Sequence, residues 1–140
     1  MKTWIVDIDG TLALMGDRGP FDWKRVGEDA PNEPVVHIVE SLIKAGDEIV
    51  PMSGRMEQCR DLTKLWLKLN VIGIKPFLSR LLMRPDGDCR PDRIVKRELY
   101  ENYVKGVYDI TGVIDDRASV VKMWREELGL TCIQVAPGDF

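Results

Sequence analysis

The segment that most constrains this chain is residues 4–11, in which a short apolar run ends in two carboxylates, a glycine and a hydroxyl. Its apolar residues are aromatic and β-branched, which is typical of a central strand. Asp7 and Asp9 are two residues apart, so on a strand they point to the same side. Gly10 permits a sharp turn where the strand ends, and in an open α/β sheet ligands bind at this end. The alternative is an ordinary acidic turn, since Asp and Gly are common in turns.

Length and composition predict one globular domain over residues 1–140, because a chain of this size can bury a single core. Charged residues make up 31% of the chain and hydrophobic residues 44%, which is typical of a soluble globular protein. No segment has the pattern of a signal peptide or a membrane span. We therefore expect a cytoplasmic protein with no membrane partner.

Net charge and cysteine content argue against two further classes. A net charge of −3 disfavours binding along a nucleic-acid backbone, so any nucleic acid should be held locally, by its end. The three cysteines are widely spaced, and a single histidine is present. We therefore expect reduced thiols and no zinc site.

Strand-like and helix-like segments alternate along the rest of the chain. Residues 12–31 are rich in Gly and Pro and predict a flap or loop with one helical turn near residues 21–24. Periodicity predicts further strands over residues 48–52, 81–83, 108–114 and 131–135, and helices over residues 33–45, 56–70, 91–103 and 118–128. Pro51 is unusual inside a strand, and we place it near the strand end. The alternation predicts a three-layer α/β fold, a parallel sheet flanked by helices on both faces with right-handed crossovers.

Further polar fragments follow later elements in a specific order. Ser53-Gly54-Arg55 follows the second strand, Lys96 lies on a later helix, and Asp115-Asp116 follows the fourth strand. With Asp7-Ile8-Asp9-Gly10-Thr11, this order resembles the haloacid dehalogenase superfamily of phosphohydrolases. Five stretches more closely resemble the 3′-phosphatase domain of polynucleotide kinase-phosphatase enzymes: residues 16–20, 52–55, 114–117, 121–125 and 134–140. This likeness runs from residue 3 to residue 140.

The resemblance implies a haloacid dehalogenase-like Rossmannoid fold and indicates where a cap domain would be inserted. Cap domains in the superfamily lie between the positions of Asp9 and Ser53 or between those of Ser53 and Lys96. Core elements already fill both intervals here, so the cap is reduced to the flap of residues 12–31. An open site of this kind admits a large substrate.

The resemblance also implies the catalytic and phosphate-binding roles. Asp7 is the expected nucleophile, which attacks phosphorus to form an aspartyl-phosphate. Asp9 is the expected acid, which protonates the leaving oxygen and then activates water. Ser53 and Lys96 are expected to bind phosphoryl oxygens. Asp92 lies one helical turn before Lys96, and we expect its carboxylate to orient the ammonium.

The resemblance places two guanidiniums around the phosphate and gives one threonine a supporting role. Arg18 in the flap and Arg55 after the second strand are candidate substrate-binding residues, because a guanidinium binds phosphate bidentately. Thr11 is expected to orient Asp9 or the loop through a hydrogen bond. For each arginine the alternative is an ordinary surface residue.

Four carboxylates, those of Asp7, Asp9, Asp115 and Asp116, would crowd one crevice. Two such charges about 4 Å apart repel by roughly 4 kcal/mol at an effective dielectric near 20. A bound cation relieves this repulsion, and an all-oxygen site that also admits phosphate suits Mg²⁺. The resemblance implies that Asp9 contributes its main-chain carbonyl. The alternative is that Asp115 ends a strand and Asp116 caps the last helix.

We predict a Mg²⁺-dependent phosphomonoesterase, a hydrolase that removes the 3′-phosphate from nucleic-acid ends or 3′-nucleotides during end repair. The family also implies a side activity on 2′,3′-cyclic phosphates. The chain lacks a Gly-x-x-x-x-Gly-Lys-Ser/Thr loop, which excludes kinase activity and leaves open whether a separate kinase or ligase chain takes part. The alternatives are a phosphatase for small nucleotide or sugar phosphates, and a non-catalytic phospho-acceptor or phosphate-binding module.

Overall fold

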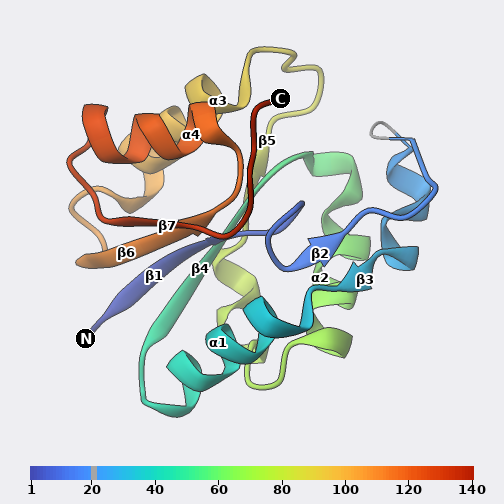
Figure 1. Cartoon of the computed structure of the whole chain (residues 1–140), viewed down its shortest axis with the longest axis horizontal. Helices are drawn as coiled ribbons and strands as arrows, with labels where there is room; N and C mark the ends of the chain where they lie inside the picture. The colour runs from blue at the N-terminus through green and yellow to red at the C-terminus, as the bar shows by residue number, and fades with distance from the viewer. Residues whose placement is uncertain (20–21) are drawn as a thin grey trace.

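The computed structural model describes residues 1–19 and 22–140, and its centre is a five-stranded parallel sheet (Figure 1). The strand order is β5-β4-β1-β6-β7, so the first strand is central. The strands of this sheet are β1 (Thr3–Asp7), β4 (Glu48–Met56), β5 (Leu82–Arg84), β6 (Ile110–Asp115) and β7 (Cys132–Gln134). Because the strands are parallel, their carboxyl ends meet at one edge.

Four α-helices and five 3-10 or π-helical segments connect the strands in the part of the chain that the structure describes. The α-helices are α1 (Glu33–Lys44), α2 (Arg60–Asn70), α3 (Asp92–Leu99) and α4 (Ala118–Lys122). The 3-10 segments are η1 (Trp23–Glu28), η2 (Glu57–Cys59) and η3 (Lys75–Arg80). Two π-helical segments, η4 (Tyr100–Val104) and η5 (Met123–Glu127), continue α3 and α4. Within the described ranges, no helix has the length and apolar character needed to cross a membrane.

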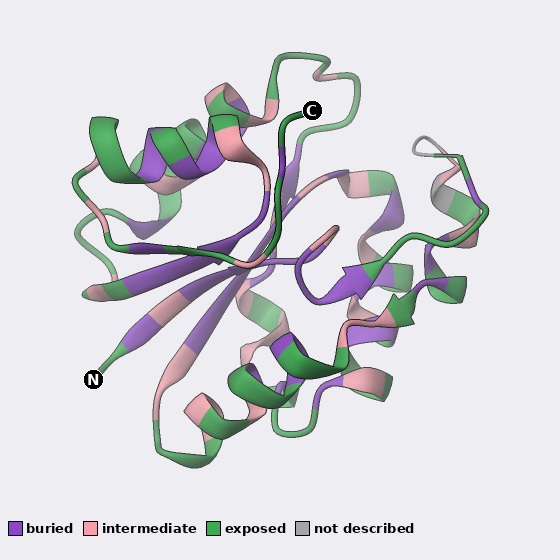
Figure 2. Cartoon of the chain, in the orientation of Figure 1, coloured by how far each residue is buried: buried purple, intermediate pink, exposed green. Residues whose placement is uncertain are grey.

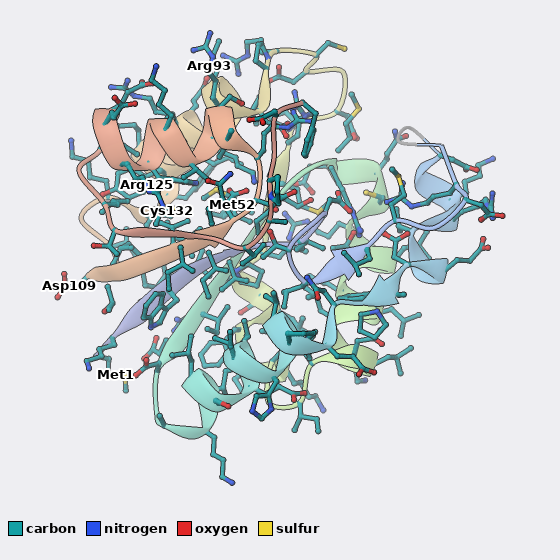
Figure 3. The ribbon with its side chains drawn as sticks, viewed as in Figure 1. Met1, Met52, Arg93, Asp109, Arg125 and Cys132 are labelled. Atoms are coloured by element: carbon teal, nitrogen blue, oxygen red, sulfur yellow. The ribbon has the colours of Figure 1, made fainter. Side chains whose placement is uncertain are left out.

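Alternating side chains of the strands form two apolar cores, one on each face of the sheet. Val6, Ile49 and Ile114 pack with residues of α1 and α2. Their neighbours Ile5, Val50 and Val113 pack with residues of α3 and α4. Met52 and Cys132 belong to this second core, and Figure 3 shows both beneath α4. In Figure 2 the strands are mainly buried while the helices keep exposed outer faces, which confirms the predicted three-layer α/β fold.

Strand β4 extends to Met56, so Pro51 lies inside the strand and the prediction that it lies near the strand end is wrong. Pro51 is paired with Val6 of β1, whereas the pairing of β4 with β5 begins only at Met52. One side of Pro51 therefore has no strand partner among the described residues. An open side tolerates a missing amide donor, which explains why proline fits here.

The predicted flap contains a two-stranded antiparallel pair, β2 (Ala13–Leu14) and β3 (Ala30–Pro31), and the η1 segment between them. Pro20 and Phe21, which belong to the predicted flap, lie outside the described residues. Asn32 occupies the N-cap position of α1, but its side chain does not cap the helix. It donates instead to the carbonyl of Thr11 at 3.0 Å, which fastens the base of the flap to the loop after β1.

Candidate active site

The central strands end beside a cleft of about 610 Å³. Most of its lining is charged, and it includes Asp7, Asp9, Lys96, Asp115 and Asp116. These residues come from the ends of β1 and β6, the loops that follow them, and α3. The fold therefore brings together acidic and basic residues from widely separated parts of the chain.

Asp7 lies at the end of β1 and accepts two hydrogen bonds. Its Oδ1 accepts a bond from Nζ of Lys96 at 2.7 Å, and its Oδ2 accepts one from Oγ1 of Thr11 at 2.8 Å. Thr11 was expected to orient Asp9 or the loop, but its hydroxyl contacts Asp7. The chain turns tightly at Gly10, where the amide of Thr11 donates to the carbonyl of Ile8. This turn brings the hydroxyl of Thr11 to the carboxylate of Asp7.

Oxygens of Asp7, Asp115 and Asp116 lie within 4.8 Å of one another, and all three residues are buried. Lys96 contributes one ammonium to this cluster, with Nζ 3.0 Å from Oδ2 of Asp115. When ionised, the three carboxylates exceed the ammonium by two negative charges. A divalent cation would balance this excess, and carboxylate oxygens are the ligands that Mg²⁺ prefers. The carboxylate of Asp9 is not part of the cluster.

Asp115 and Asp116 differ in how many lone pairs remain free. Asp115 accepts bonds from Lys96, from the indole of Trp124 at 3.2 Å and from the amide of Asp116 at 2.8 Å. Among the described residues, the Asp116 carboxylate accepts a bond only from Thr11, at 3.4 Å. Asp116 therefore has more capacity to bind a cation directly. It does not cap α4, since Arg117 occupies the N-cap position and makes no side-chain cap there.

Burial and charge shift the ionisation of the cluster. Burial raises the pKa of Asp7 well above its usual value, the Asp115 carboxylate adds to this rise, and Lys96 opposes it. Burial also raises the pKa of Asp116. For Lys96, burial disfavours the ammonium, but the Asp115 and Asp7 carboxylates outweigh this and raise its pKa. Lys96 thus stays protonated, while a further positive charge would favour ionisation of Asp7 and Asp116.

Asp9 is held by a separate network of two arginines. Arg55 donates to Asp9 from Nη2 at 2.7 Å and from Nε at 3.0 Å, to Asp29 at 3.1 Å and to Thr63 at 3.0 Å. Arg55 is fully buried and is not among the cleft-lining residues. It was expected to bind substrate, but it lies behind Asp9, because β4 continues past Ser53 and carries Arg55 into the interior.

Arg18 lines the cleft and belongs to the same network. It donates to Asp29 from Nε at 2.7 Å and from Nη2 at 2.9 Å, and Nη2 lies 3.5 Å from Asp9. Asp29 was not predicted. Its carboxylate has no exposed surface, and its carbonyl accepts a bond from the indole of Trp66 at 2.8 Å. No sequence signal distinguishes Asp29 from the other acidic residues of the Gly- and Pro-rich flap.

Ser53 and Asp92 have partners other than those expected. Ser53 is fully buried and is not among the cleft-lining residues, and its Oγ accepts a bond from the amide of Arg55 at 3.0 Å. Asp92 was expected to orient Lys96, but it pairs with Arg84 and, at 3.1 Å, with Nη1 of Arg117. Asp92 begins α3 and faces the loops, whereas Lys96 points into the sheet edge.

Sequence reasoning did not predict the polar contacts that three further residues make near the site. Arg84 ends β5 at the same sheet edge, Arg117 follows the Asp115-Asp116 pair, and both line the cleft. Their positions after strands are the signal that could have found them. Trp124 was not among the expected site residues. A buried indole N–H usually has an acceptor, which could have suggested its bond to a site carboxylate.

Comparison with known proteins places the chain in a family. The family model for the polynucleotide kinase PNKP phosphatase domain matches residues 1–140. A putative bifunctional polynucleotide kinase/RNA ligase of Autographa californica nuclear polyhedrosis virus is 36% identical over 124 residues, which are 87% of this chain and 17% of that protein.

Solved structures agree with this assignment. A chain in the structure of the Pnkp1/Rnl/Hen1 RNA repair complex is 37% identical, with a TM-score of 0.88 over 99% of this chain and 43% of that one. The class C acid phosphatase of Bacillus anthracis is 18% identical, with a TM-score of 0.64 over 99% of this chain and 66% of that one, and it shows likeness of fold alone.

The chain thus spans less than half the length of the viral relative and of the repair-complex chain. The family model covers every residue of it, and the resemblance inferred from the sequence motifs is confirmed. The chain belongs to the family of polynucleotide kinase PNKP phosphatase domains, which has the haloacid dehalogenase fold.

Proposed function

We propose that this protein is a Mg²⁺-dependent phosphomonoesterase that removes the 3′-phosphate from nucleic-acid ends or 3′-nucleotides. The position of Asp7 is the observation that most supports this function. Its carboxylate lines the cleft at the end of the central strand and accepts hydrogen bonds from Lys96 at 2.7 Å and Thr11 at 2.8 Å. A carboxylate oriented from two sides is suited to nucleophilic attack. Membership of a phosphatase family supports phosphorus as the atom attacked.

The reaction takes place in two steps on the side chains of Asp7 and Asp9. Asp7 attacks phosphorus, the bond to the 3′ oxygen breaks, and Asp9 donates a proton to that oxygen. An aspartyl-phosphate results. Asp9 then takes a proton from water as the water oxygen attacks phosphorus, which releases phosphate and restores Asp7. Because the Asp9 side chain is 39% exposed at the cleft, both the leaving group and water can reach it.

Asp7, Asp115 and Asp116 fit a Mg²⁺ ion, since their oxygens cluster and carry an excess of negative charge. Family resemblance adds the main-chain carbonyl of Asp9 to this set. When bound, Mg²⁺ would neutralise charge on the phosphoryl oxygens and keep Asp7 ionised. The hydrogen bonds from Lys96 and Trp124 would hold the Asp115 carboxylate in its orientation.

The remaining residues bind or orient the phosphate in this proposal. Lys96 and Arg18 line the cleft and supply positive charge to the phosphoryl oxygens. The family resemblance implies that the hydroxyl of Ser53 donates to one of these oxygens, although Ser53 is buried and does not line the cleft in this structure. Arg55 would act through Asp9, whose carboxylate it holds.

Relatives support the substrate class. The viral relative is named as a polynucleotide kinase/RNA ligase, and the structural relative is a chain of the Pnkp1/Rnl/Hen1 RNA repair complex. Both relatives support nucleic-acid 3′ ends as the substrate and a kinase or ligase as a partner. The cleft opens at the sheet edge beside a small flap, which favours a polymer end over a fully enclosed metabolite.

The test is phosphate release from matched oligonucleotides that carry either a 3′- or a 5′-phosphate, and from sugar phosphates. We expect kcat/KM to be far higher for the 3′-phosphate, and Asp7→Asn to abolish turnover while the far-UV spectrum is unchanged. Arg18→Ala should lose about 1–3 kcal/mol of transition-state stabilisation, the scale of one charged hydrogen bond.

Other outcomes would reject the proposal. Equal rates on 3′-phosphates, 5′-phosphates and sugar phosphates would favour a small-molecule phosphatase. A single turnover without repeated phosphate release would favour a phospho-acceptor module. Full turnover by a folded Asp7→Asn variant would exclude the covalent mechanism.

A further inference from the structure

Residues 135–140 are fastened to the loop that follows β6. The amide of Val135 donates to the carbonyl of Asp115 at 3.1 Å, and the side chain of Gln134 donates to the main-chain carbonyl of Asp116 at 2.9 Å. The amide of Ala118 donates to the carbonyl of Gly138 at 2.9 Å. Gly138 lies so close that an added Cβ would be 2.0 Å from the Asp116 carbonyl oxygen. The segment that leads to Phe140 is therefore anchored beside the carboxylate cluster.

Phe140 is the one aromatic residue among the described residues that line the cleft. The residue is 69% exposed and packs in neither apolar core. The guanidinium carbon of Arg117 lies 4.5 Å from the centre of the ring. Arg117 is itself held by Asp92 at 3.1 Å. The ring is thus supported by an anchored cation while most of its surface faces solvent.

Folding does not explain this position of Phe140. A phenylalanine that stabilises a domain is normally buried, and a single exposed one is common on protein surfaces. Phe140 differs from such residues because it lines the cleft. Two other apolar side chains, Met15 and Met56, also line this mainly charged cleft. The cleft therefore combines a charged region suited to phosphate with apolar side chains suited to a planar ring.

We infer that Phe140 stacks on the nucleobase of the nucleotide that carries the 3′-phosphate, with Arg117 supporting the opposite side of the ring. This inference rests on the proposed function and adds a base-binding subsite to it. Stacking on an aromatic side chain tolerates any base, because every base has a π-face. The subsite therefore distinguishes nucleotides from sugar phosphates without selecting a base sequence. A cleft of about 610 Å³ has the size expected for a ligand of this kind.

The experiment compares a nucleoside 3′-phosphate with ribose 3-phosphate, which carries the same ester without a base. For Phe140→Ala we expect the ratio of kcat/KM for the two substrates to fall at least about 5-fold, the lower limit for one stacked base. The change should lie mainly in KM. Phe140→Trp should keep the ratio, because the indole also stacks. Tyr103→Ala is the matched control, since Tyr103 is 57% exposed but lines a different hollow.

Binding to the Asp7→Asn protein provides a second readout without turnover. We expect Phe140→Ala in this background to weaken binding of the nucleoside 3′-phosphate relative to inorganic phosphate by a similar factor. A general loss of structure would weaken both ligands equally.

The outcomes separate the inference from the function on which it rests. Absence of phosphate release from every 3′-phosphate by the wild-type protein would reject both. Wild-type turnover with the same substrate ratio in the Phe140→Ala variant would reject only the stacking subsite. A loss in the Tyr103→Ala control equal to that in Phe140→Ala would also reject it.

Discussion

Arg55 joins two carboxylates, Asp9 at the cleft and the buried Asp29, and it reaches both from the interior of the protein. In this structure Arg55 contacts Asp9, Asp29 and Thr63 and does not line the cleft. The Asp29 carboxylate has no solvent-exposed surface, so Arg55 and Arg18 balance its negative charge in place of water. Arg55 therefore contributes both to the stability of the site and to the orientation of Asp9.

Arg55→Ala should destabilise the protein by about 3–5 kcal/mol, because it leaves Asp29 buried with only part of its counter-charge. Urea unfolding of wild type and variant measures this loss. Arg97→Ala is the control, since Arg97 pairs with Glu127 and Glu101 at the surface and should change stability by less than about 1 kcal/mol. Equal effects of the two substitutions would contradict the structural role of Arg55.

Thr11 acts on the expected nucleophile, because its hydroxyl donates to Asp7. Thr11→Val keeps the shape of the side chain but removes the donor. Hydrogen bonds to charged groups contribute about 1.5–3 kcal/mol, so kcat should fall roughly 10- to 100-fold. Thr11→Ser keeps the hydroxyl and should keep most of the activity. The prediction fails if valine and serine give the same kcat, or if the valine variant unfolds.

Among the elements, the loop after β1 determines the geometry of the carboxylate cluster. Gly10 has a φ of +79°, a conformation that other residues rarely adopt. An added Cβ there would lie 2.1 Å from Oδ2 of Asp116. The loop thus depends on glycine twice, for its backbone conformation and for the close approach of a site carboxylate.

Gly10→Ala should therefore displace Asp116 and weaken Mg²⁺ binding by at least 10-fold, as measured by titration calorimetry. Gly87→Ala is the matched control, since Gly87 has a φ of +78° with no atom of the described residues within 4 Å of the added Cβ. Gly87→Ala should cost about 1–2 kcal/mol of stability, the cost of left-handed backbone, without changing metal affinity. Equal metal affinities of the two variants would show that the contact with Asp116 is unimportant.

At the scale of the whole molecule, charge near the cleft is divided into one balanced group and two unbalanced groups. Asp9 and Asp29 are paired with Arg18 and Arg55, and these charges cancel. Asp92 is shared by Arg84 and Arg117, which leaves positive charge at one side of the cleft. Among the described residues, only the cluster of Asp7, Asp115 and Asp116 carries an excess of negative charge there. This distribution favours binding of a cation at the cluster.

The charge excess predicts how stability depends on pH and Mg²⁺. Burial raises the pKa of Asp7 and Asp116 in the folded state. A raised carboxyl pKa stabilises the fold below the unfolded value near 3.8, and this contribution is lost as the pH rises through the folded pKa. The Tm of the metal-free protein should therefore fall as the pH rises from about 5 to 8.

Mg²⁺ should oppose this fall, so the increase in Tm that it causes should be larger at the higher pH, and chelation should abolish activity. Thermal unfolding with Mg²⁺ or with a chelator, over this pH range, measures the effect. Asp88 is not expected to contribute, because the adjacent Arg90 lowers its pKa to about 2. An increase in Tm that does not change with pH, or full activity in excess chelator, would contradict the prediction.

The sequence by itself determined the order of the main strands and helices and seven of the eighteen described residues that line the cleft. Strand periodicity and the position of glycine are local properties, and they placed Asp7, Asp9 and Asp115 at strand ends before any packing was known. Because parallel strands end at one edge of the sheet, these positions also predicted that the residues would converge. Lys96 was found from its order relative to the strands, through the family resemblance.

Only the tertiary structure decided which side chains pair with one another. Arg55 is 26 residues from Asp29 and 46 residues from Asp9, and no periodicity in the sequence links them. Asp92 has the helical spacing for contact with Lys96, yet it pairs with Arg84 on a neighbouring strand. Such partners depend on which way each side chain points once strands and helices have packed. Spacing along the sequence limits these directions but does not select one of them.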